Sequence, residues 1–258
     1  MMTTFSGNAK TNVGQTSISI VLAAYNGQAY ISQQLQSILP QLQKEDELII
    51  SLDPSTDQTQ AMLLEFIQAH QDQPAHLTLL QGPGQGVVKN FEHALSQIKN
   101  DIVVLCDQDD VWFDHKLDRL RQAFIDNPKL QAVVHDAIVC DANLKPIASS
   151  FMDYHHSQKG FLQNLVRNSF IGCCMAIRKE IIEQSLPFPL IPMHDQFLGL
   201  QALRKGDVLF LKDPLIYYRR HENNASSLHP ASLSKQLRWR LQIVKALQDR
   251  PLDHKKNL

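Results

Sequence analysis

The chain has 258 residues and a mass of 29.3 kDa, enough for one large α/β domain and too short for an assembly of several modules. Hydrophobic residues make up 43% and charged residues 20% of it, a balance that excludes an intrinsically disordered chain. The 25 Lys and Arg residues against 26 Asp and Glu residues give a net charge of −1, so we expect no nucleic-acid partner, because general nucleic-acid binding relies on excess positive charge.

Neither the cysteines nor the hydropathy indicates a secreted or membrane-spanning protein. The four cysteines at 106, 140, 173 and 174 have no zinc-binding spacing and are too few for a disulfide scaffold. No window approaches the roughly 18–20 apolar residues of a membrane span, and the polar residues 1–17 contain no apolar segment like that of a signal peptide. We therefore expect a cytoplasmic protein.

The first half of the chain alternates short apolar runs with helical patterns. Residues 18–24 form an uninterrupted apolar run, which is typical of a strand buried on both faces. Further strands are expected at 47–53, 77–81, 101–107 and 132–140, and helices at 57–70, 86–99 and 114–127. Strand and helix alternate to about residue 127, which predicts right-handed crossovers and a parallel sheet with helices on both sides.

The second half is less regular. We expect a loop at 151–160, a short helix at 161–168, an apolar strand-like stretch at 172–178, a helix at 194–205, two short strands at 208–212 and 215–219, and a last helix at 232–248. No spacer rich in Gly, Ser or Pro separates the halves. The change in pattern therefore indicates a change of role within a single domain.

Polar residues follow three of the expected strands. Tyr25-Asn26 comes after the first, the segment 53–57 after the second, and Asp107-Gln108-Asp109-Asp110 after the fourth. Ligands of parallel sheets bind beyond the carboxyl ends of the strands, so these residues are candidates for a binding site. They could equally be helix caps and turn formers, and for Asp57 a cap is the preferred interpretation.

The acidic segment 107–110 needs a compensating charge. Two like charges about 4 Å apart repel by roughly 4 kcal/mol at an effective dielectric constant near 20. Mg²⁺ or Mn²⁺ offsets such repulsion, and these ions bind one or two carboxylates together with phosphate oxygens. The segment therefore favours a metal-bridged diphosphate ligand over a solvated acidic turn.

Other candidates remain open on the residues alone. Asp195 precedes a helical pattern and could be an ordinary first-turn residue or a general base that takes a proton from a hydroxyl group. Lys89 could meet phosphate oxygens or be solvated. The segment 217–224 could close over an anionic leaving group, and His221 in it could be a metal ligand or a structural residue. Cys173 and Cys174 are expected to be buried.

In chain order, Ala24-Tyr25-Asn26, 53–57, 86–90, 107–112, Gly172 and His194-Asp195 resemble the motifs of family 2 glycosyltransferases of the GT-A fold. The resemblance covers residues 17–224. It implies a Rossmann-like α/β domain with a mostly parallel sheet, divided into a nucleotide-binding half (17–110) and an acceptor half (111–224). It also implies an inverting transfer of a sugar from a nucleotide-diphosphate donor to an acceptor hydroxyl.

The resemblance assigns roles on the donor side. It implies that Asp53 contacts the nucleotide base, that Ala24, Tyr25 and Asn26 line the same pocket, and that Asp107 with Gln108 faces the ribose or the donor sugar. Asp109 then binds the metal, Mg²⁺ or Mn²⁺, with His221 as a further ligand. Lys89 and Arg219 would neutralise the departing diphosphate.

On the acceptor side, the resemblance makes Asp195 the catalytic base. Gly172, His194 and Trp112 are the residues expected at the acceptor site. The acceptor is expected to be a glycan or a lipid-linked sugar.

Two details refine the resemblance. Leu52-Asp53-Pro54 stands where the family commonly has two acidic residues and a glycine, so one carboxylate is missing from the base pocket. The forms Asp-Gln-Asp-Asp-Val-Trp and Tyr-Arg-x-His-x-x-Asn are similar to the subset that includes bacterial rhamnosyltransferases of surface polysaccharides. That subset implies dTDP-rhamnose or a UDP-sugar as donor.

Two other functions remain alternatives. A sugar nucleotidyltransferase would also use a metal and carboxylates on an α/β sheet, but the glycine-rich basic signature expected after its first strand is missing from residues 25–28. A non-catalytic nucleotide-sugar-binding subunit is the third interpretation, and Leu52 is the residue that favours it.

The tail, residues 225–258, is expected to be a basic amphipathic segment. From His229 onward it has seven Lys and Arg residues against two Asp residues, a net charge of +5. Its helical pattern favours either peripheral contact with an anionic membrane at the inner face, where a lipid-linked acceptor would be found, or packing on the domain or a second subunit.

Overall fold

The structure is a computed structural model that describes residues 16–73, 75–222 and 232–251. Four parallel strands form the first half of its sheet. The strands are β1 (Ile18–Ala24), β2 (Glu47–Leu52), β3 (His76–Gln81) and β4 (Ile102–Cys106). β1 pairs with β2 and β4, and β2 pairs with β3, all in parallel. The parallel sheet expected from the alternating patterns is confirmed here.

The second half extends the same sheet with strands of both directions. These strands are β5 (Val111–Trp112), β6 (Leu130–Cys140), β7 (Pro146–Ala148), β8 (Met175–Arg178) and β9 (Asp207–Arg219). The order β3-β2-β1-β4-β8-β6-β9-β5, with β7 beside β6, makes one nine-stranded sheet within the described residues. β8 is antiparallel to β4 and β6, whereas β9 runs parallel to β6.

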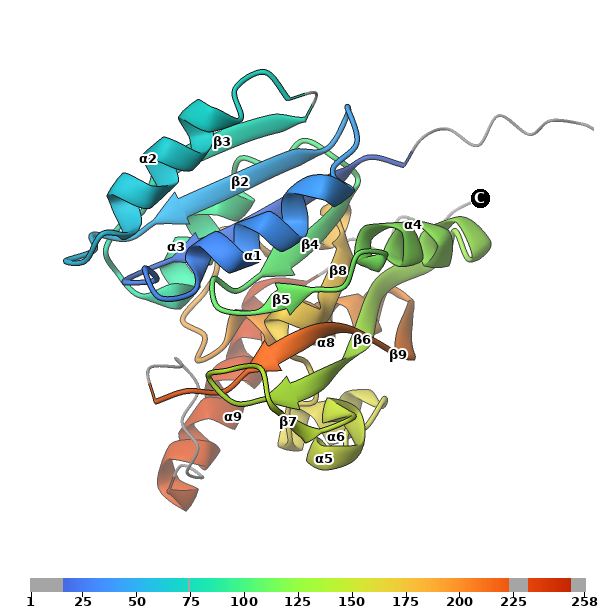
Figure 1. The fold of residues 1–258 in the computed structure, drawn as a ribbon. Coiled ribbons are helices and arrows are strands. Elements are labelled where there is room, and N and C mark those ends of the chain that lie inside the picture. Colours follow the sequence, from blue (N-terminus) through green and yellow to red (C-terminus); the bar gives the residue numbers. More distant parts are fainter. Residues whose placement is uncertain (1–15, 74, 223–231, 252–258) are drawn as a thin grey trace, which may run out of the picture.

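Helices cover both faces of the sheet (Figure 1). α1 (Ile31–Ile38), α2 (Thr59–Ala69) and α4 (Lys116–Asp126) pack in one hydrophobic cluster. α3 (Val87–Leu95), α7 (Lys179–Ser185), α8 (His194–Lys205) and α9 (Leu233–Asp249) pack in the other. The shorter elements are α5 (Phe151–His155), α6 (Phe161–Val166), η1 (Leu39–Gln41) and η2 (Gly172–Cys174).

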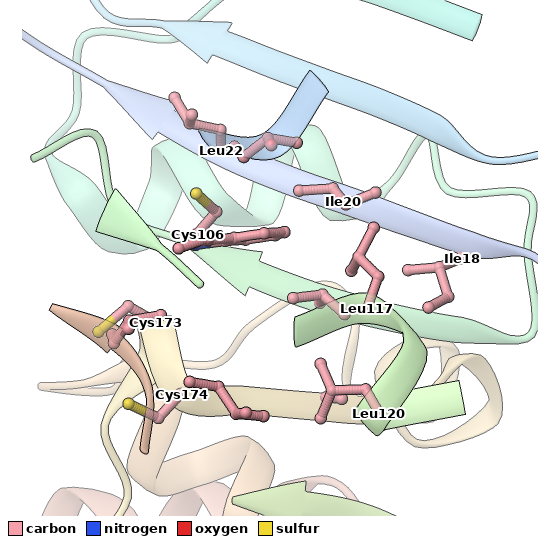
Figure 2. Close-up of a cluster of buried hydrophobic side chains, with 14 of the residues drawn as sticks. Ile18, Ile20, Leu22, Cys106, Leu117, Leu120, Cys173 and Cys174 are labelled. Carbon is pink, nitrogen blue, oxygen red and sulfur yellow. The ribbon is translucent and has the colours of Figure 1, made fainter. Parts of the chain in front are cut away.

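β1 shows why the sheet forms a core with two faces. Ile18, Ile20 and Leu22 point into the first cluster, while Val21 lies in the second, because successive side chains of a strand point to opposite faces. Figure 2 shows Ile18, Ile20 and Leu22 in a row along β1, in one cluster with Cys106 of β4 and with Leu117 and Leu120 of α4. A strand covered on both faces needs an uninterrupted apolar sequence, as β1 has.

The structure corrects several expected boundaries. The expected loop at 151–160 begins with α5, which Ser150 caps by accepting a hydrogen bond from the Asp153 amide. The two expected strands at 208–212 and 215–219 are one strand, β9, whose register against β6 shifts near Pro214. The stretch 172–178 divides into η2 and β8.

The tail helix α9 packs on the domain through its C-terminal half, where Ile243, Ala246 and Leu247 are buried. The remainder of the expected tail, residues 225–231 and 252–258, lies outside the described residues. None of the helices in the described ranges combines the length and hydropathy that a membrane span requires.

Candidate active site

The loops that follow β1 and β2 are tied together at the carboxyl edge of the sheet. Asn26 adopts a left-handed conformation with φ of 46°. Its side-chain oxygen accepts a hydrogen bond from the Thr56 amide at 2.8 Å, and its own amide donates to Ser55 Oγ at 3.0 Å. The polar segments expected after these two strands are therefore hydrogen-bonded to each other. We call the continuous surface that they form the wall of the site.

Asp53 closes this wall from the end of β2. It is 5% exposed, and its Oδ1 accepts a hydrogen bond from the Gly84 amide at 2.8 Å. A Cβ atom on Gly82 would lie 2.5 Å from Asp53 Oδ1 and 2.8 Å from its backbone nitrogen, so a glycine is needed for the loop after β3 to approach so closely. Asp53 thus joins the loops that follow β2 and β3.

Gln108 connects the acidic segment to the loop after β1. Its side-chain Oε1 accepts from the Tyr25 amide and its Nε2 donates to the Tyr25 carbonyl, both at 2.9 Å. The Tyr25 side chain is left 55% exposed. The amide of Gln108 therefore fixes the backbone of Tyr25 and leaves the ring available to a ligand.

Asp109 and His221, both predicted as metal ligands, lie together. His221 Nε2 is 2.8 Å from Asp109 Oδ2, and the imidazole stacks on Tyr30 with 4.7 Å between ring centroids. The two residues are far apart in the sequence and meet because β9 ends beside the loop after β4. A carboxylate oxygen next to an imidazole nitrogen is a ligand pair that Mn²⁺ accepts.

Arg219, predicted to face the diphosphate, has several partners within the protein. Its side chain is buried, with Nε donating to the Asp109 carbonyl at 2.7 Å and a terminal nitrogen donating to Gln33 Oε1 at 2.6 Å. The Arg219 backbone amide donates to Asp110 Oδ1 at 3.0 Å. Arg219 therefore holds the acidic loop in place, and its contact with a diphosphate stays a prediction.

The carboxyl groups of Asp107 and Asp110 in the acidic segment have raised pKa values. Burial, followed by the charges of Asp109 and Asp195, raises the pKa of Asp107 to about 7. Burial also raises the pKa of Asp110, whose Oδ2 has no hydrogen-bond partner in the described structure. In the part of the chain that is described, Asp107, Asp110 and Cys173 form a group whose potential ligand atoms lie within 4.8 Å of one another.

Lys116, which the sequence analysis did not single out, lies buried near the acidic segment. Its Nζ donates to the Cys173 carbonyl at 2.8 Å and sits 3.9 Å from the centre of the Trp112 ring. Burial lowers the pKa of Lys116, and its charge in turn acts to lower the pKa of Asp107. Part of the compensating charge that the acidic segment needs is thus supplied by the protein itself.

We expect Lys116→Met to destabilise the fold by about 1–3 kcal/mol, because it leaves the buried Cys173 carbonyl without its hydrogen-bond donor and removes the cation above the Trp112 ring. Urea unfolding followed by circular dichroism measures this loss. Lys129→Met is the matched control, because Lys129 is exposed and its replacement should change the free energy of unfolding by less than about 0.5 kcal/mol. Equal stability of the two variants would contradict the structural role of the buried Lys116 contacts.

Asp195 occupies the first turn of α8 and faces the same site. Burial raises its pKa to about 6, while hydrogen bonds from the backbone of Gln196 and Gly172 and from the Asn168 side chain act in the opposite direction. Asn168 Nδ2 is 3.4 Å from Asp195 Oδ1. The charge of Asp195 also raises the pKa of Asp107.

His194 and Gly172 lie beside Asp195. His194 stacks on Phe91 with 4.1 Å between ring centroids, and burial lowers its pKa to about 4. A Cβ atom on Gly172 would lie 3.3 Å from His194 Nε2 and 3.8 Å from Asp195 Cβ. Gly172 therefore keeps a narrow space open beside the carboxylate, and His194 is neutral at pH 7.

Two other predicted site residues have protein partners of their own. Lys89 forms an ion pair with Glu92 at 2.6 Å on the surface of α3. Trp112 is 2% exposed and belongs to the hydrophobic core beneath the acidic loop, a position that supports the loop from below. Contact of Lys89 with phosphate and of Trp112 with the acceptor stays a prediction for both residues.

The acidic loop at 107–110 together with the carboxylate of Asp195 is the arrangement expected of an enzyme that uses a nucleotide sugar. The chain matches the family model "Glycosyl transferase family 2" over residues 19–186 and belongs to that family. It is therefore a glycosyltransferase, and family membership gives no support to the sugar nucleotidyltransferase alternative.

Curated relatives agree with this assignment. The chain is 27% identical over 217 residues to the dTDP-rhamnosyl transferase RfbG of Shigella flexneri, which covers 79% of this chain and 72% of that protein. It is 24% identical over 222 residues to the UDP-Glc:alpha-D-GlcNAc-diphosphoundecaprenol beta-1,3-glucosyltransferase WfgD of Escherichia coli, covering 85% and 83% respectively. The rhamnosyltransferase-like resemblance is thereby confirmed.

Solved structures confirm the GT-A fold. S. aureus TarS 1-349 in complex with UDP-GlcNAc superposes with a TM-score of 0.66 at 19% identity, covering 92% of this chain and 68% of that one. The mannosyltransferase PcManGT of Pyrobaculum calidifontis, in complex with GDP-Man and Mn²⁺, gives a TM-score of 0.57 at 18% identity, covering 92% and 65%.

Proposed function

We propose that the chain is an inverting, metal-dependent glycosyltransferase of bacterial surface polysaccharide synthesis. It transfers a sugar from a nucleotide-diphosphate donor to a hydroxyl group of a glycan or lipid-linked acceptor. The observation that carries this proposal is the Asp109–His221 pair beside the acidic segment, with Asp107 next to Cys173 and Asp195 next to the adjoining Gly172. We assign residues 17–110 to the donor half and 111–224 to the acceptor half.

On the donor side, the wall of Ala24, Tyr25, Asn26 and Asp53 receives the nucleotide. The exposed ring of Tyr25 offers a stacking surface for the base, and the carboxylate of Asp53 offers a hydrogen-bond acceptor. Asp107 and Gln108 lie next to this wall and face the ribose and the donor sugar. The backbone contacts of Gln108 keep that part of the pocket rigid.

The residues present fit a Mg²⁺ or Mn²⁺ ion. Asp109 and His221 supply an oxygen and a nitrogen ligand at 2.8 Å from each other, and Asp110 Oδ2 is a buried acceptor without a hydrogen-bond partner in the described structure. A bound ion would neutralise the negative charge that develops on the departing diphosphate. Lys89 and Arg219 are the cations that we place next to the same leaving group.

On the acceptor side, Asp195 is the catalytic base. Its carboxylate accepts the proton of the acceptor hydroxyl while the hydroxyl oxygen attacks the anomeric carbon, and the bond from that carbon to the diphosphate oxygen breaks. Attack from the face opposite the leaving group inverts the configuration. A pKa of about 6 leaves Asp195 mostly ionised at pH 7 and makes it a stronger base than an exposed aspartate. Gly172, His194 and Trp112 bound the acceptor side.

The names of two relatives support the substrate classes. One relative is called a dTDP-rhamnosyl transferase, and another acts, by its name, on an acceptor linked to diphosphoundecaprenol. We infer dTDP-rhamnose or a UDP-sugar as donor and a lipid-linked or glycan acceptor. We place the enzyme in the cytoplasm, with peripheral contact at the inner face of the membrane through its C-terminal tail.

A thermal-shift screen tests the donor and the metal together. We expect dTDP-rhamnose or UDP-glucose with Mn²⁺ or Mg²⁺ to raise the melting temperature, since a ligand at 100 times its Kd stabilises by about 2.7 kcal/mol, and each kcal/mol corresponds to about 2–4 °C for a domain of this size. GDP-mannose serves as the comparison donor. EDTA should remove most of the shift, and a shift of equal size in EDTA would contradict metal dependence.

A further inference from the structure

Among the described residues, a hydrophobic surface is exposed where α9 meets α6. Its members recur at three- and four-residue steps along α9 and at a four-residue step along α6, so each set lies on one side of its helix. They are Leu233, Leu237, Leu241 and Val244 of α9, which are 82%, 57%, 62% and 36% exposed, and Leu162 and Val166 of α6, which are 71% and 60% exposed. We call these six residues the α6–α9 apolar face.

Arg240 joins the two parts of this face. It is a helix-surface neighbour of Leu237 and Val244, which lie three residues before and four residues after it. Its guanidinium group donates two hydrogen bonds to the Val166 carbonyl at 3.1 and 3.0 Å. The apolar stripe of α9 therefore continues onto α6, while a different side of α9, with Ile243 and Ala246, is buried against the domain.

The surroundings of the face are positively charged. α9 carries four Lys and Arg residues, Lys235, Arg238, Arg240 and Lys245, against Asp249, a net charge of +3. Exposed Lys159 and Arg167 flank α6, and residues 154–178 contain no Asp or Glu. A second copy of the chain would bring like charges together on this face, whereas anionic lipid headgroups would attract them.

The other side of α6 supports the catalytic region. Asn164 is fully buried, its Oδ1 accepts a hydrogen bond from the Ser169 amide at 2.8 Å, and its carbonyl accepts one from Gln196 Nε2 at 2.8 Å. Asn168, two residues past the end of α6, contacts Asp195. One short helix therefore separates the apolar face from the segment that holds the catalytic carboxylate.

We propose that the α6–α9 apolar face is a docking surface for a bilayer of anionic phospholipids. The leucine side chains enter the boundary between headgroups and acyl chains, and the flanking Lys and Arg side chains contact the lipid phosphates. Docking in this orientation keeps the acceptor side of the site close to the membrane surface. This last consequence rests on the proposed function, whereas vesicle binding itself requires no sugar transfer.

Vesicle co-flotation of the full chain tests the proposal, with phosphatidylcholine vesicles that contain or lack phosphatidylglycerol. We expect wild-type protein to bind the anionic vesicles and to be released by salt, because exposed charges are screened. Leu237→Ser/Leu241→Ser and, separately, Leu162→Ser/Val166→Ser should each lower the partition coefficient about tenfold. Leu64→Ser is the matched control, since Leu64 is 53% exposed on α2 at the opposite end of the molecule (Figure 1).

Two further measurements separate the outcomes. Calorimetry with UDP or dTDP and Mn²⁺ should give equal affinity for all four proteins, so that loss of vesicle binding is not confused with failure of the donor site. Light scattering gives the oligomeric state. Equal binding to neutral and anionic vesicles would overturn the proposal, as would an equal loss of binding in Leu64→Ser. It would also be overturned if the wild-type protein did not bind vesicles but formed a dimer that the apolar-face substitutions dissociate.

Discussion

Asp195→Asn is expected to abolish sugar transfer while metal-dependent nucleotide binding is kept. Asparagine has the same shape as aspartate but cannot accept the proton of the acceptor hydroxyl, and loss of a general base costs about 10²–10⁴-fold in rate. Binding should not weaken, because the charge of Asp195 raises the pKa of Asp107, and removing that charge favours the ionised form of Asp107. Transfer rates and calorimetry with UDP or dTDP and Mn²⁺ measure the two effects.

A matched control separates the role of Asp195 from a general effect of charge. Asp207 is exposed at the start of β9, and Asp207→Asn removes the same charge without touching the site. It should transfer sugar at the wild-type rate. If Asp195→Asn keeps most of the wild-type activity, the base has been assigned to the wrong residue.

Asp109→Asn is expected to weaken metal-dependent donor binding. The substitution removes the negative charge that faces His221 at 2.8 Å, and an amide oxygen is a much poorer ligand for a divalent cation than a carboxylate. We expect the affinity for nucleotide in the presence of Mn²⁺ to fall by at least about 10–100-fold, a loss seen even when residues that only orient metal ligands are replaced. Calorimetry with and without Mn²⁺ measures the change.

The control for Asp109 lies a few residues further along the chain. Asp114 is exposed between β5 and α4, so Asp114→Asn should bind nucleotide like the wild-type protein. In Asp109→Asn, nucleotide binding in EDTA should equal that of the wild type, because only the metal-dependent part is lost. An equal loss with and without metal would mean that Asp109 contacts the nucleotide itself or supports the fold.

Most of the parallel half of the fold could be predicted because three of its four strands, β1, β2 and β4, are buried on both faces. Such strands are uninterrupted apolar runs, and β1, β2 and β4 were expected within a residue or two of their observed bounds. We did not expect the helix α1, because its sequence is mostly polar and its buried face includes a glutamine, Gln34. Its apolar positions Ile31, Leu35 and Ile38 nevertheless have helical spacing. That spacing was the available signal.

The candidate site could be predicted where function requires polar residues directly after a strand. The carboxylates at 107–110 are of this kind, whereas Asp195 lies in the first turn of α8, where the sequence showed only a helical pattern. Contacts between distant segments could not be predicted, because no local pattern encodes them. Lys116 reads in the sequence as an ordinary first-turn lysine of a helix, and Arg219 reads as a free cation, yet both are buried against the backbone of site loops.

The acidic loop is compensated in part by the protein itself. Crowded carboxylates after β4 do require compensation. We expected a metal ion to supply all of this compensation, whereas the buried ammonium group of Lys116 supplies some of it at Asp107. The cation proposed for Asp109 and His221 would therefore offset the charge that remains at the outer edge of the loop.

Crystals of the wild-type protein grown with MnCl₂ and UDP or dTDP give the most direct measurement. The anomalous signal of manganese locates the ion without reference to the fold. We predict a single strong peak within bonding distance of Asp109 and His221 that also contacts the diphosphate, and no such peak in Asp109→Asn. A nucleotide bound along the wall of Tyr25 and Asp53 with no manganese beside the carboxylates at 107–110 would contradict the account.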